Sequence, residues 1–184
     1  MQTIAIDMDE VIADFNSKMI RHFNAEFGEH IGLNDLAGQT IQQLRPALRE
    51  KINQMIGEPA FFSDLDVIAG AQDVVRELSG KYHVFITTAA MEFPASFTAK
   101  FNWLQTHFGF LSAMNFVFCG NKRILNADFL IDDNVRHFEH FVGEGILFTA
   151  PHNIHARGYR RVNDWREVAD LFCRFAPRRT GFAD

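Results

Sequence analysis

The sequence predicts an α/β fold built on a Rossmann-like parallel sheet with helices on both faces. Short apolar runs without polar alternation recur along the chain, as in strands that are buried on both faces of a parallel sheet. Between them lie segments with apolar residues at helical spacing, and such alternation of strands and helices indicates a largely parallel sheet. A chain of 184 residues with 47% apolar content is long enough for one domain that carries an insertion.

Five apolar runs predict the strands. They cover residues 3–6, 82–88, 115–119, 128–132 and 145–149. Apolar residues at helical spacing predict helices at about 15–29, 41–57, 69–81, 94–109, 134–142 and 163–175. Pro94 and Gly109 lie at the start and the end of one of these segments, where proline and glycine are favoured in helices.

Composition argues against several classes of protein. The net charge of -5, with only two short basic clusters, argues against a nucleic-acid-binding surface. No apolar stretch approaches the roughly 20 residues that span a membrane, and the N-terminus has no signal-peptide pattern, so we expect a cytoplasmic protein without a membrane partner. Cys119 and Cys173 fit no redox or metal-binding spacing and are interpreted as buried apolar residues. The oligomeric state, a homodimer included, is left open.

Polar residues follow the predicted strands at their carboxyl ends. They are Asp7 and Asp9 after the first strand, Thr87 and Thr88 in the second, Lys122 after the third, and Asp132 and Asp133 after the fourth. Open parallel sheets bind ligands at the carboxyl ends of their strands. We therefore expect these carboxylates, hydroxyls and the ammonium group to converge on one site.

The chemistry of this set favours a phosphate and a hard cation. Carboxylate oxygens together with phosphate select Mg²⁺, and Thr88 and Lys122 are suited to hold phosphate oxygens. Once the phosphate charge is neutralised, one carboxylate can attack phosphorus while the other moves the proton, and the D-x-D spacing supplies both from one loop. An Asp pair after a strand can instead cap the following helix, and for either pair alone this alternative stays open.

The order of these motifs resembles that of a known superfamily. "DMDEV", "FITT", Lys122 and "LIDD" are similar to the four motifs of the haloacid dehalogenase superfamily of phosphotransferases. Within it, the chain resembles the 5'(3')-deoxyribonucleotidase family, on the evidence of "DMDEVIADF", "FFSDLDVIAGAQDVVREL", "NADFLIDDN" and "GILFTAPHN" followed by "DWREV". The resemblance covers most of the chain and is weak through residues 20–58.

The resemblance implies a role for each acidic residue. Asp7 is expected to be the nucleophile that forms an aspartyl-phosphate, and Asp9 the general acid and base. Mg²⁺ is expected to bind the Asp7 side chain, the Asp9 backbone carbonyl, and one or both of Asp132 and Asp133. The sequence does not decide between these last two.

The resemblance also implies the substrate contacts. Thr88 and Lys122 would bind the transferring phosphate, and Ala89 occupies the adjacent phosphate-binding position, where nucleotidases often have a second hydroxyl. Phe15 would face the base or the sugar.

It implies a domain division as well. Residues 16–68 would form a small helical cap inserted after the first strand, and residues 1–15 and 69–184 the catalytic core.

Two departures from the family pattern bear on the substrate. Glu10 stands where many members have glycine, so the loop after Asp9 is expected to differ in shape or charge. The cap segment 38–41 has no aromatic residue to stack on a pyrimidine, although Phe61 or Phe62 could do so.

The expected function is a magnesium-dependent phosphomonoesterase acting on deoxyribonucleoside or ribonucleoside monophosphates. Two alternatives remain: the same chemistry on a sugar phosphate or another small phosphomonoester, and a phosphate-binding regulatory domain without turnover. Glu92 could reach the substrate. The histidine pairs His137/His140 and His152/His155 are interpreted as exposed or hydrogen-bonded rather than as a zinc site.

Overall fold

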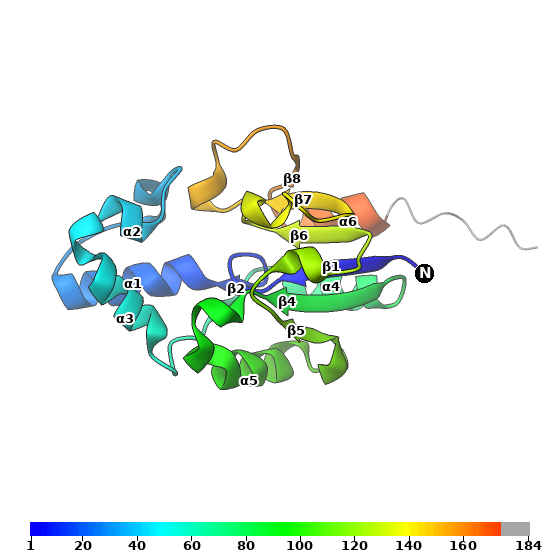
Figure 1. The fold of residues 1–184 in the computed structure, drawn as a ribbon, viewed down its shortest axis with the longest axis horizontal. Coiled ribbons are helices and arrows are strands. Elements are labelled where there is room, and N and C mark those ends of the chain that lie inside the picture. Colours follow the sequence, from blue (N-terminus) through cyan, green and yellow to red (C-terminus); the bar gives the residue numbers. More distant parts are fainter. Residues whose placement is uncertain (174–184) are drawn as a thin grey trace, which may run out of the picture.

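A six-stranded parallel sheet forms the centre of the molecule (Figure 1). The computed structural model describes residues 1–173, except for the side chain of Cys173. The strand order is β5-β4-β1-β6-β7-β8. The strands are β1 (Thr3–Asp7), β4 (His83–Thr88), β5 (Phe116–Phe118), β6 (Phe129–Asp132), β7 (Glu144–Phe148) and β8 (Arg160–Val162). The predicted α/β class is confirmed.

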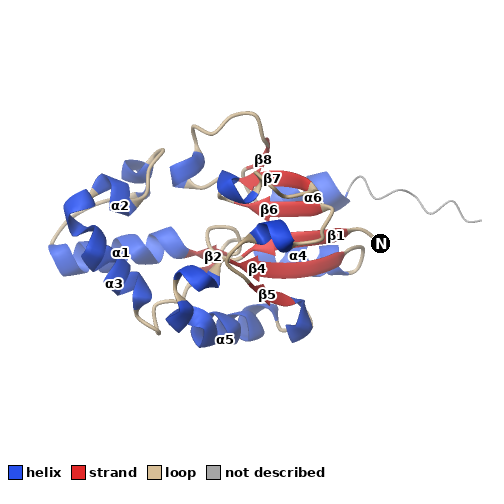
Figure 2. Ribbon diagram, in the orientation of Figure 1, coloured by secondary structure: helices blue, strands red, loops and turns tan. Residues whose placement is uncertain are grey.

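Within residues 1–173, three α-helices belong to the part of the chain that contains the sheet: α4 (Ala71–Ser79), α5 (Phe97–Phe108) and α6 (Trp165–Cys173). Helices α4 and α6 pack against each other behind the sheet, while α5 lies beside β5 (Figure 2). No helix within residues 1–173 is long and apolar enough to cross a membrane.

A second group of helices lies beyond the carboxyl ends of the strands (Figure 1). We call it the helical group; it contains α1 (Phe15–Phe27), α2 (Ile41–Leu44) and α3 (Arg49–Gly57). The chain enters it through β2 (Ala13–Asp14) and leaves it through β3 (Asp66–Val67). These two short strands pair antiparallel, so the two connections to the sheet lie side by side.

Local sequence signals set the ends of these helices. The Asp14 carboxylate accepts a hydrogen bond from the backbone N–H of Ser17 at 3.0 Å and so caps the start of α1. Gly28 ends the helix with φ 64°, a left-handed conformation that glycine adopts easily. Residues 41–57, which share helical spacing, divide into two helices because Pro46 has no N–H to donate and its ring clashes inside a helix.

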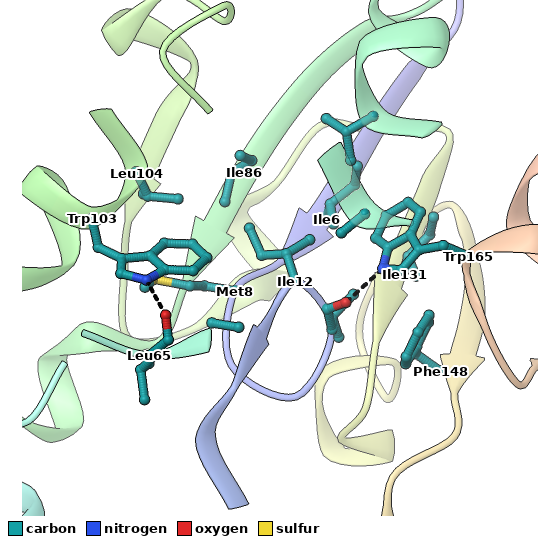
Figure 3. Close-up of a cluster of buried hydrophobic side chains, with 14 of the residues drawn as sticks. Ile6, Met8, Ile12, Leu65, Ile86, Trp103, Leu104, Ile131, Phe148 and Trp165 are labelled. Atoms are coloured by element: carbon teal, nitrogen blue, oxygen red, sulfur yellow. Dashed lines mark hydrogen bonds between the residues drawn. The ribbon is translucent and has the colours of Figure 1, made fainter. Parts of the chain in front are cut away.

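Two buried tryptophans bind the segments that connect the sheet with the helical group (Figure 3). The indole N–H of Trp165 donates to the Val11 carbonyl at 2.7 Å, and that of Trp103 donates to the Leu65 carbonyl at 2.8 Å. The rings pack among the apolar side chains of the core, so both indole hydrogen bonds are shielded from water. The loop after β1 and the segment before β3 are therefore fixed to α6 and α5.

One prediction about the carboxyl-terminal half was wrong, and one strand there was missed. Residues 134–142 form a single 3₁₀ turn, Val135–His137, instead of a helix. The connection from β6 to β7 is shorter than the dozen or more residues that parallel strands usually need, and Phe138 must fold back over Gly145. Strand β8 was not predicted at all, because its sequence, "RRV", carries two arginines, as charged edge strands often do.

Candidate active site

A pocket of about 250 Å³ lies between the carboxyl ends of the strands and the helical group. The sheet side contributes Asp7, Asp9, Ala89 and Asp133, and the first residue of α1 contributes Phe15; the sequence predicted all five as site residues. The helical group contributes Thr40, Ile41, Gln42 and Ile56. The three other predicted site residues, Thr88, Lys122 and Asp132, are buried and bind or adjoin residues that line the pocket.

Three carboxylates from two neighbouring strands meet at the pocket floor. Each of Asp7, Asp132 and Asp133 offers an oxygen, and these oxygens lie within 4.8 Å of one another. Strand β1 pairs with β6 in parallel, which brings the two strand ends together. The ammonium of Lys122 contacts Asp7 Oδ1 and donates to Asp132 Oδ2 at 2.6 Å. The predicted convergence of Asp7, Lys122, Asp132 and Asp133 is confirmed.

The electrostatics of this floor favour a further cation. Burial is the main cause that raises the pKa of Asp133 well above its usual range, and Asp132, Asp7 and Glu10 add to it. Burial also raises the pKa of Asp7 to about 6, although Lys122 opposes the shift. Burial lowers the pKa of Lys122, but Asp132 and Asp7 more than reverse this, so the lysine stays charged. The raised pKa values mean that ionising all three carboxyls is costly even beside Lys122, and a further bound cation would lower that cost.

The two acids of the "DD" pair have different surroundings. Asp132 is saturated with donors: the backbone N–H of Asn134 binds Oδ1 at 2.9 Å, and Lys122 and His137 Nδ1 bind Oδ2 at 2.6 and 2.8 Å. Burial raises the pKa of Asp132, but Lys122 and His137 outweigh it, so the net shift is downward. Within residues 1–173, the Asp133 carboxylate has one side-chain contact, to His152 Nε2, at the longer distance of 3.5 Å. Asp133 therefore keeps lone pairs free for a cation.

Asp9 stands apart from these three carboxylates and has a lysine of its own. Its Oδ2 contacts the ammonium of Lys100, which also donates to Thr88 Oγ1 at 2.9 Å. Its Oδ1 is buried and has no hydrogen-bond partner among the described residues. One oxygen of Asp9 is thus fixed while the other is available to a ligand.

Lys100 was missed by the sequence reasoning. It lies on the buried face of α5 together with Trp103 and Leu104, and its side chain is 4% exposed. A lysine within the apolar stripe of a helix was the available signal, because lysine is almost never fully buried unless it is paired.

Glu10 gives the loop after Asp9 an unusual backbone. Its φ of 61° is the only positive value at a non-glycine position in residues 1–173, and left-handed backbone costs energy for such a residue. The carboxylate accepts a hydrogen bond from the backbone N–H of Asn16 at 2.6 Å, at the start of α1. Burial raises the pKa of Glu10 to about 7. The left-handed conformation explains why glycine suits this position.

Aromatic side chains form one wall of the pocket. Phe15 and Phe62 lie with ring centroids 6.0 Å apart at 28°, and the Lys100 ammonium stands 4.3 Å from the centroid of Phe62. Phe61 packs against Phe15 from outside the pocket, where it lines a separate groove. The segment 38–41 does reach the pocket, through Thr40 and Ile41.

Each of the two histidine pairs is split between the pocket and the surface. His137 and His152 both line the pocket, whereas His140 is exposed. Among the described residues, the carboxylates of Asp7, Asp132 and Asp133 are the one set of side chains grouped closely enough to hold a metal ion.

Comparison with known proteins identifies the family. Residues 1–177 match the family model described as "5' nucleotidase, deoxy (Pyrimidine), cytosolic type C protein". The chain belongs to this nucleotidase family. A "Putative 5'(3')-deoxyribonucleotidase" of Staphylococcus aureus is 45% identical over 173 residues, which cover 93% of this chain and 95% of that protein. The "5'(3')-deoxyribonucleotidase" of Bacillus subtilis is 36% identical over 167 residues, 91% and 96% of the two chains.

Solved structures of haloacid dehalogenase-like hydrolases share the fold of this nucleotidase. One from Deinococcus radiodurans, with bound phosphate and sodium, has a TM-score of 0.60 at 13% identity and covers 93% of this chain and 95% of its own. Another, from Bacillus subtilis and bound to magnesium, has a TM-score of 0.52 at 12% identity, over 92% and 97% of the two chains. The nucleotidase thus has the fold of haloacid dehalogenase-like hydrolases, the fold that its sequence motifs predicted.

Proposed function

We propose that this phosphatase is a magnesium-dependent nucleotidase that converts deoxyribonucleoside or ribonucleoside monophosphates to nucleoside and phosphate through an aspartyl-phosphate. The observation that carries the proposal is the arrangement at the pocket floor. Three buried carboxylates and the Lys122 ammonium meet there, and the same pocket is lined by Asp9, one of whose oxygens is buried and has no partner within residues 1–173. Such a site accepts a phosphate together with a divalent cation, and it places a second carboxyl group within reach of the leaving oxygen.

The donor set fits Mg²⁺, which prefers carboxylate and carbonyl oxygens. We assign the direct contacts to Asp7 and Asp133, with the backbone carbonyl of Asp9. Asp132 is left to hold Lys122, because its oxygens are already occupied by protein donors. The bound cation would neutralise phosphate charge that otherwise repels a carboxylate nucleophile.

The protein groups then divide the reaction between them. Asp7 attacks phosphorus, the bond from phosphorus to the ester oxygen breaks, and Asp9 gives that oxygen a proton. Asp9 next removes a proton from water, which attacks the aspartyl-phosphate and releases phosphate.

The remaining phosphate contacts follow from the hydrogen bonds in the site. The Thr88 hydroxyl accepts from Lys100, so its own proton is free to donate to a phosphate oxygen, and Lys122 supplies a charged donor. Ala89 borders the same pocket and offers only its backbone to the phosphate.

The pocket wall supports a nucleotide as the substrate. Phe15 and Phe62 present aromatic surface, and Thr40 and Gln42 add polar groups opposite the floor. A base stacked on an aromatic ring gains about 1–3 kcal/mol. The names of the related deoxyribonucleotidases point to the same class of substrate. A sugar phosphate, the alternative, would leave this aromatic wall unused.

The helical group is proposed to be a cap that closes over the substrate and excludes water, with residues 16–68 as its bounds. The pairing of β2 with β3 supports this, because the chain crosses between sheet and helical group at those two strands. We keep as predictions a cytoplasmic location and the lack of nucleic-acid and membrane partners. Whether the protein forms a homodimer stays open.

The test is phosphate release from deoxyribonucleoside, ribonucleoside and sugar monophosphates, with Mg²⁺ and with a chelator. Asp7→Asn should abolish release and keep the fold. Asp64→Asn is the matched control, because Asp64 pairs with Lys18 outside the pocket and should not affect the reaction. Preference for nucleotides with restoration by Mg²⁺ would support the proposal. Release only from sugar phosphates would make a sugar phosphate, not a nucleotide, the substrate. Unchanged activity in Asp7→Asn would refute the aspartyl-phosphate intermediate.

A further inference from the structure

A row of polar contacts runs from the pocket mouth to the phosphate-binding lysine. Glu92, after β4, forms an ion pair with Arg136, after β6, and both side chains line the pocket and are about half exposed. Arg136 Nε donates to His137 Nε2 at 3.2 Å, and His137 Nδ1 lies 2.8 Å from Asp132 Oδ2. The same Asp132 oxygen accepts from Lys122 at 2.6 Å. Exposure thus falls from about half at the mouth to none at Lys122 and Asp132.

The donors and acceptors of this row fix the tautomer of His137. Arginine has only donors, so His137 Nε2 must accept and cannot carry a proton. The ring proton therefore lies on Nδ1, which donates to Asp132 Oδ2. Asp132 accepts from Asn134 at its other oxygen, so His137 and Lys122 together determine where Oδ2 points.

The orientation of Asp132 determines in turn the position of the Lys122 ammonium. That ammonium is buried between Asp7 and Asp132, and Asp7 is the proposed nucleophile. If Asp132 rotated, Lys122 would lose a strong buried contact and move toward Asp7 alone, where it would block the attacking oxygen. A donor that keeps Asp132 in place thus keeps both Lys122 and Asp7 in working positions.

We propose that His137, held in one tautomer by the Arg136–Glu92 ion pair, is a positioning residue that fixes Asp132 and through it the phosphate-binding ammonium of Lys122. The part that concerns phosphate rests on the proposed function; the hydrogen-bond row itself does not. The protein without phosphate, at neutral pH, should already show this row of hydrogen bonds.

The first test reads the tautomer directly by ¹⁵N NMR of the histidine rings, with the His137 signals assigned by their absence in His137→Asn. Wild-type protein should show a protonated Nδ1 and an unprotonated Nε2. Glu92→Gln should shift His137 toward a mixture of tautomers. Glu144→Gln is the matched control, because it removes a similarly exposed carboxylate paired with Arg160 and should leave the spectrum unchanged. A wild-type ring protonated on Nε2 would overturn the proposal.

The second test compares two replacements of the ring. Asparagine places its amide N–H where His137 carries Nδ1–H, while glutamine places it one bond farther along. Titration calorimetry with inorganic phosphate in the presence of Mg²⁺ should show affinity about 10-fold weaker in His137→Gln, the size expected for the loss of such a supporting contact, and a smaller loss in His137→Asn. Equal affinity in all three correctly folded proteins would refute the positioning role.

The two proposals can fail separately. If wild-type protein releases no phosphate from any substrate but His137 has the expected tautomer, only the proposed function fails. If nucleotides are hydrolysed and His137→Gln binds phosphate and turns over normally, only the positioning role fails.

Discussion

Replacement of Lys100 by methionine tests the part of the site that was not predicted from the sequence. The Lys100 ammonium binds Asp9 Oδ2 and Thr88 Oγ1, and so holds both the proposed acid and a phosphate-binding hydroxyl. Methionine keeps an unbranched side chain, one atom shorter, that can still pack against the Phe62 ring, but it removes the charge and both hydrogen bonds. Asp9 would then be free to rotate, and neither of its oxygens would be held in place.

The expected size follows from the contact that is lost. A hydrogen bond to a charged group contributes about 1.5–3 kcal/mol. Each 1.36 kcal/mol in the activation free energy changes the rate tenfold. If losing the Lys100–Asp9 hydrogen bond destabilises mainly the transition state, kcat/KM should fall by about 10- to 100-fold, with most of the change in kcat.

The chain offers a close control for this substitution. Lys18 is equally buried, also binds an aspartate, Asp64, and also stands over a phenylalanine ring, Phe61, but it lies outside the pocket. Lys18→Met should change thermal stability and leave the kinetics of phosphate release as in wild type. If both variants lost activity to the same degree, or if Lys100→Met kept full kcat, the role assigned to Lys100 would be wrong.

Three further outcomes are expected. Phe15→Leu should raise KM for a nucleotide by about 5- to 100-fold, from the loss of about 1–3 kcal/mol of stacking, yet leave kcat for a small aryl phosphate unchanged; equal effects on both substrates would show that the ring does not contact the base. In metal-free protein, burial raises the pKa of Asp7 from 3.8 to about 6 and that of Glu10 from 4.5 to about 7. The contribution of these two groups to the free energy of unfolding is therefore fully present below about pH 4 and is lost as the pH rises toward 7. Melting temperatures should fall as the pH is raised across that range, and they should fall less in Glu10→Gln. A melting temperature that increases with rising pH would contradict the burial argument. At pH 7.5, Mg²⁺ should raise the melting temperature of wild type but not of Asp133→Asn, whereas an equal shift in both would remove Asp133 from the metal site.

The sequence predicted the floor of the site well because topology fixes it. Asp7, Lys122, Asp132 and Asp133 all follow parallel strands, so the identification of the strands already placed them at one edge of the sheet. Their division of labour was beyond the sequence: the choice between Asp132 and Asp133 depends on which oxygens already have donors, and that is decided by His137 and Asn134.

The sequence was less informative where contacts are non-local. Lys100 could not be paired with Asp9 without knowledge of how α5 packs, and the turn at 135–137 replaced a predicted helix because β7 begins so soon after β6. The aromatic wall is a similar case. Segment 38–41 lacks rings, but folding brings Phe15 and Phe62 to the pocket from segments far apart in the sequence.

The indole hydrogen bonds of Trp165 and Trp103 give the protein a built-in optical probe. These are the only two tryptophans in the chain, and each binds a carbonyl on one of the two segments that join the sheet to the helical group. Intrinsic fluorescence therefore reports on those two connections and on little else. If the proposed cap closes when a phosphate analogue binds, a change in emission would place the bending at the two segments that the tryptophans bind, whereas constant emission would place it in the residues between those segments and the nearest helix of the helical group.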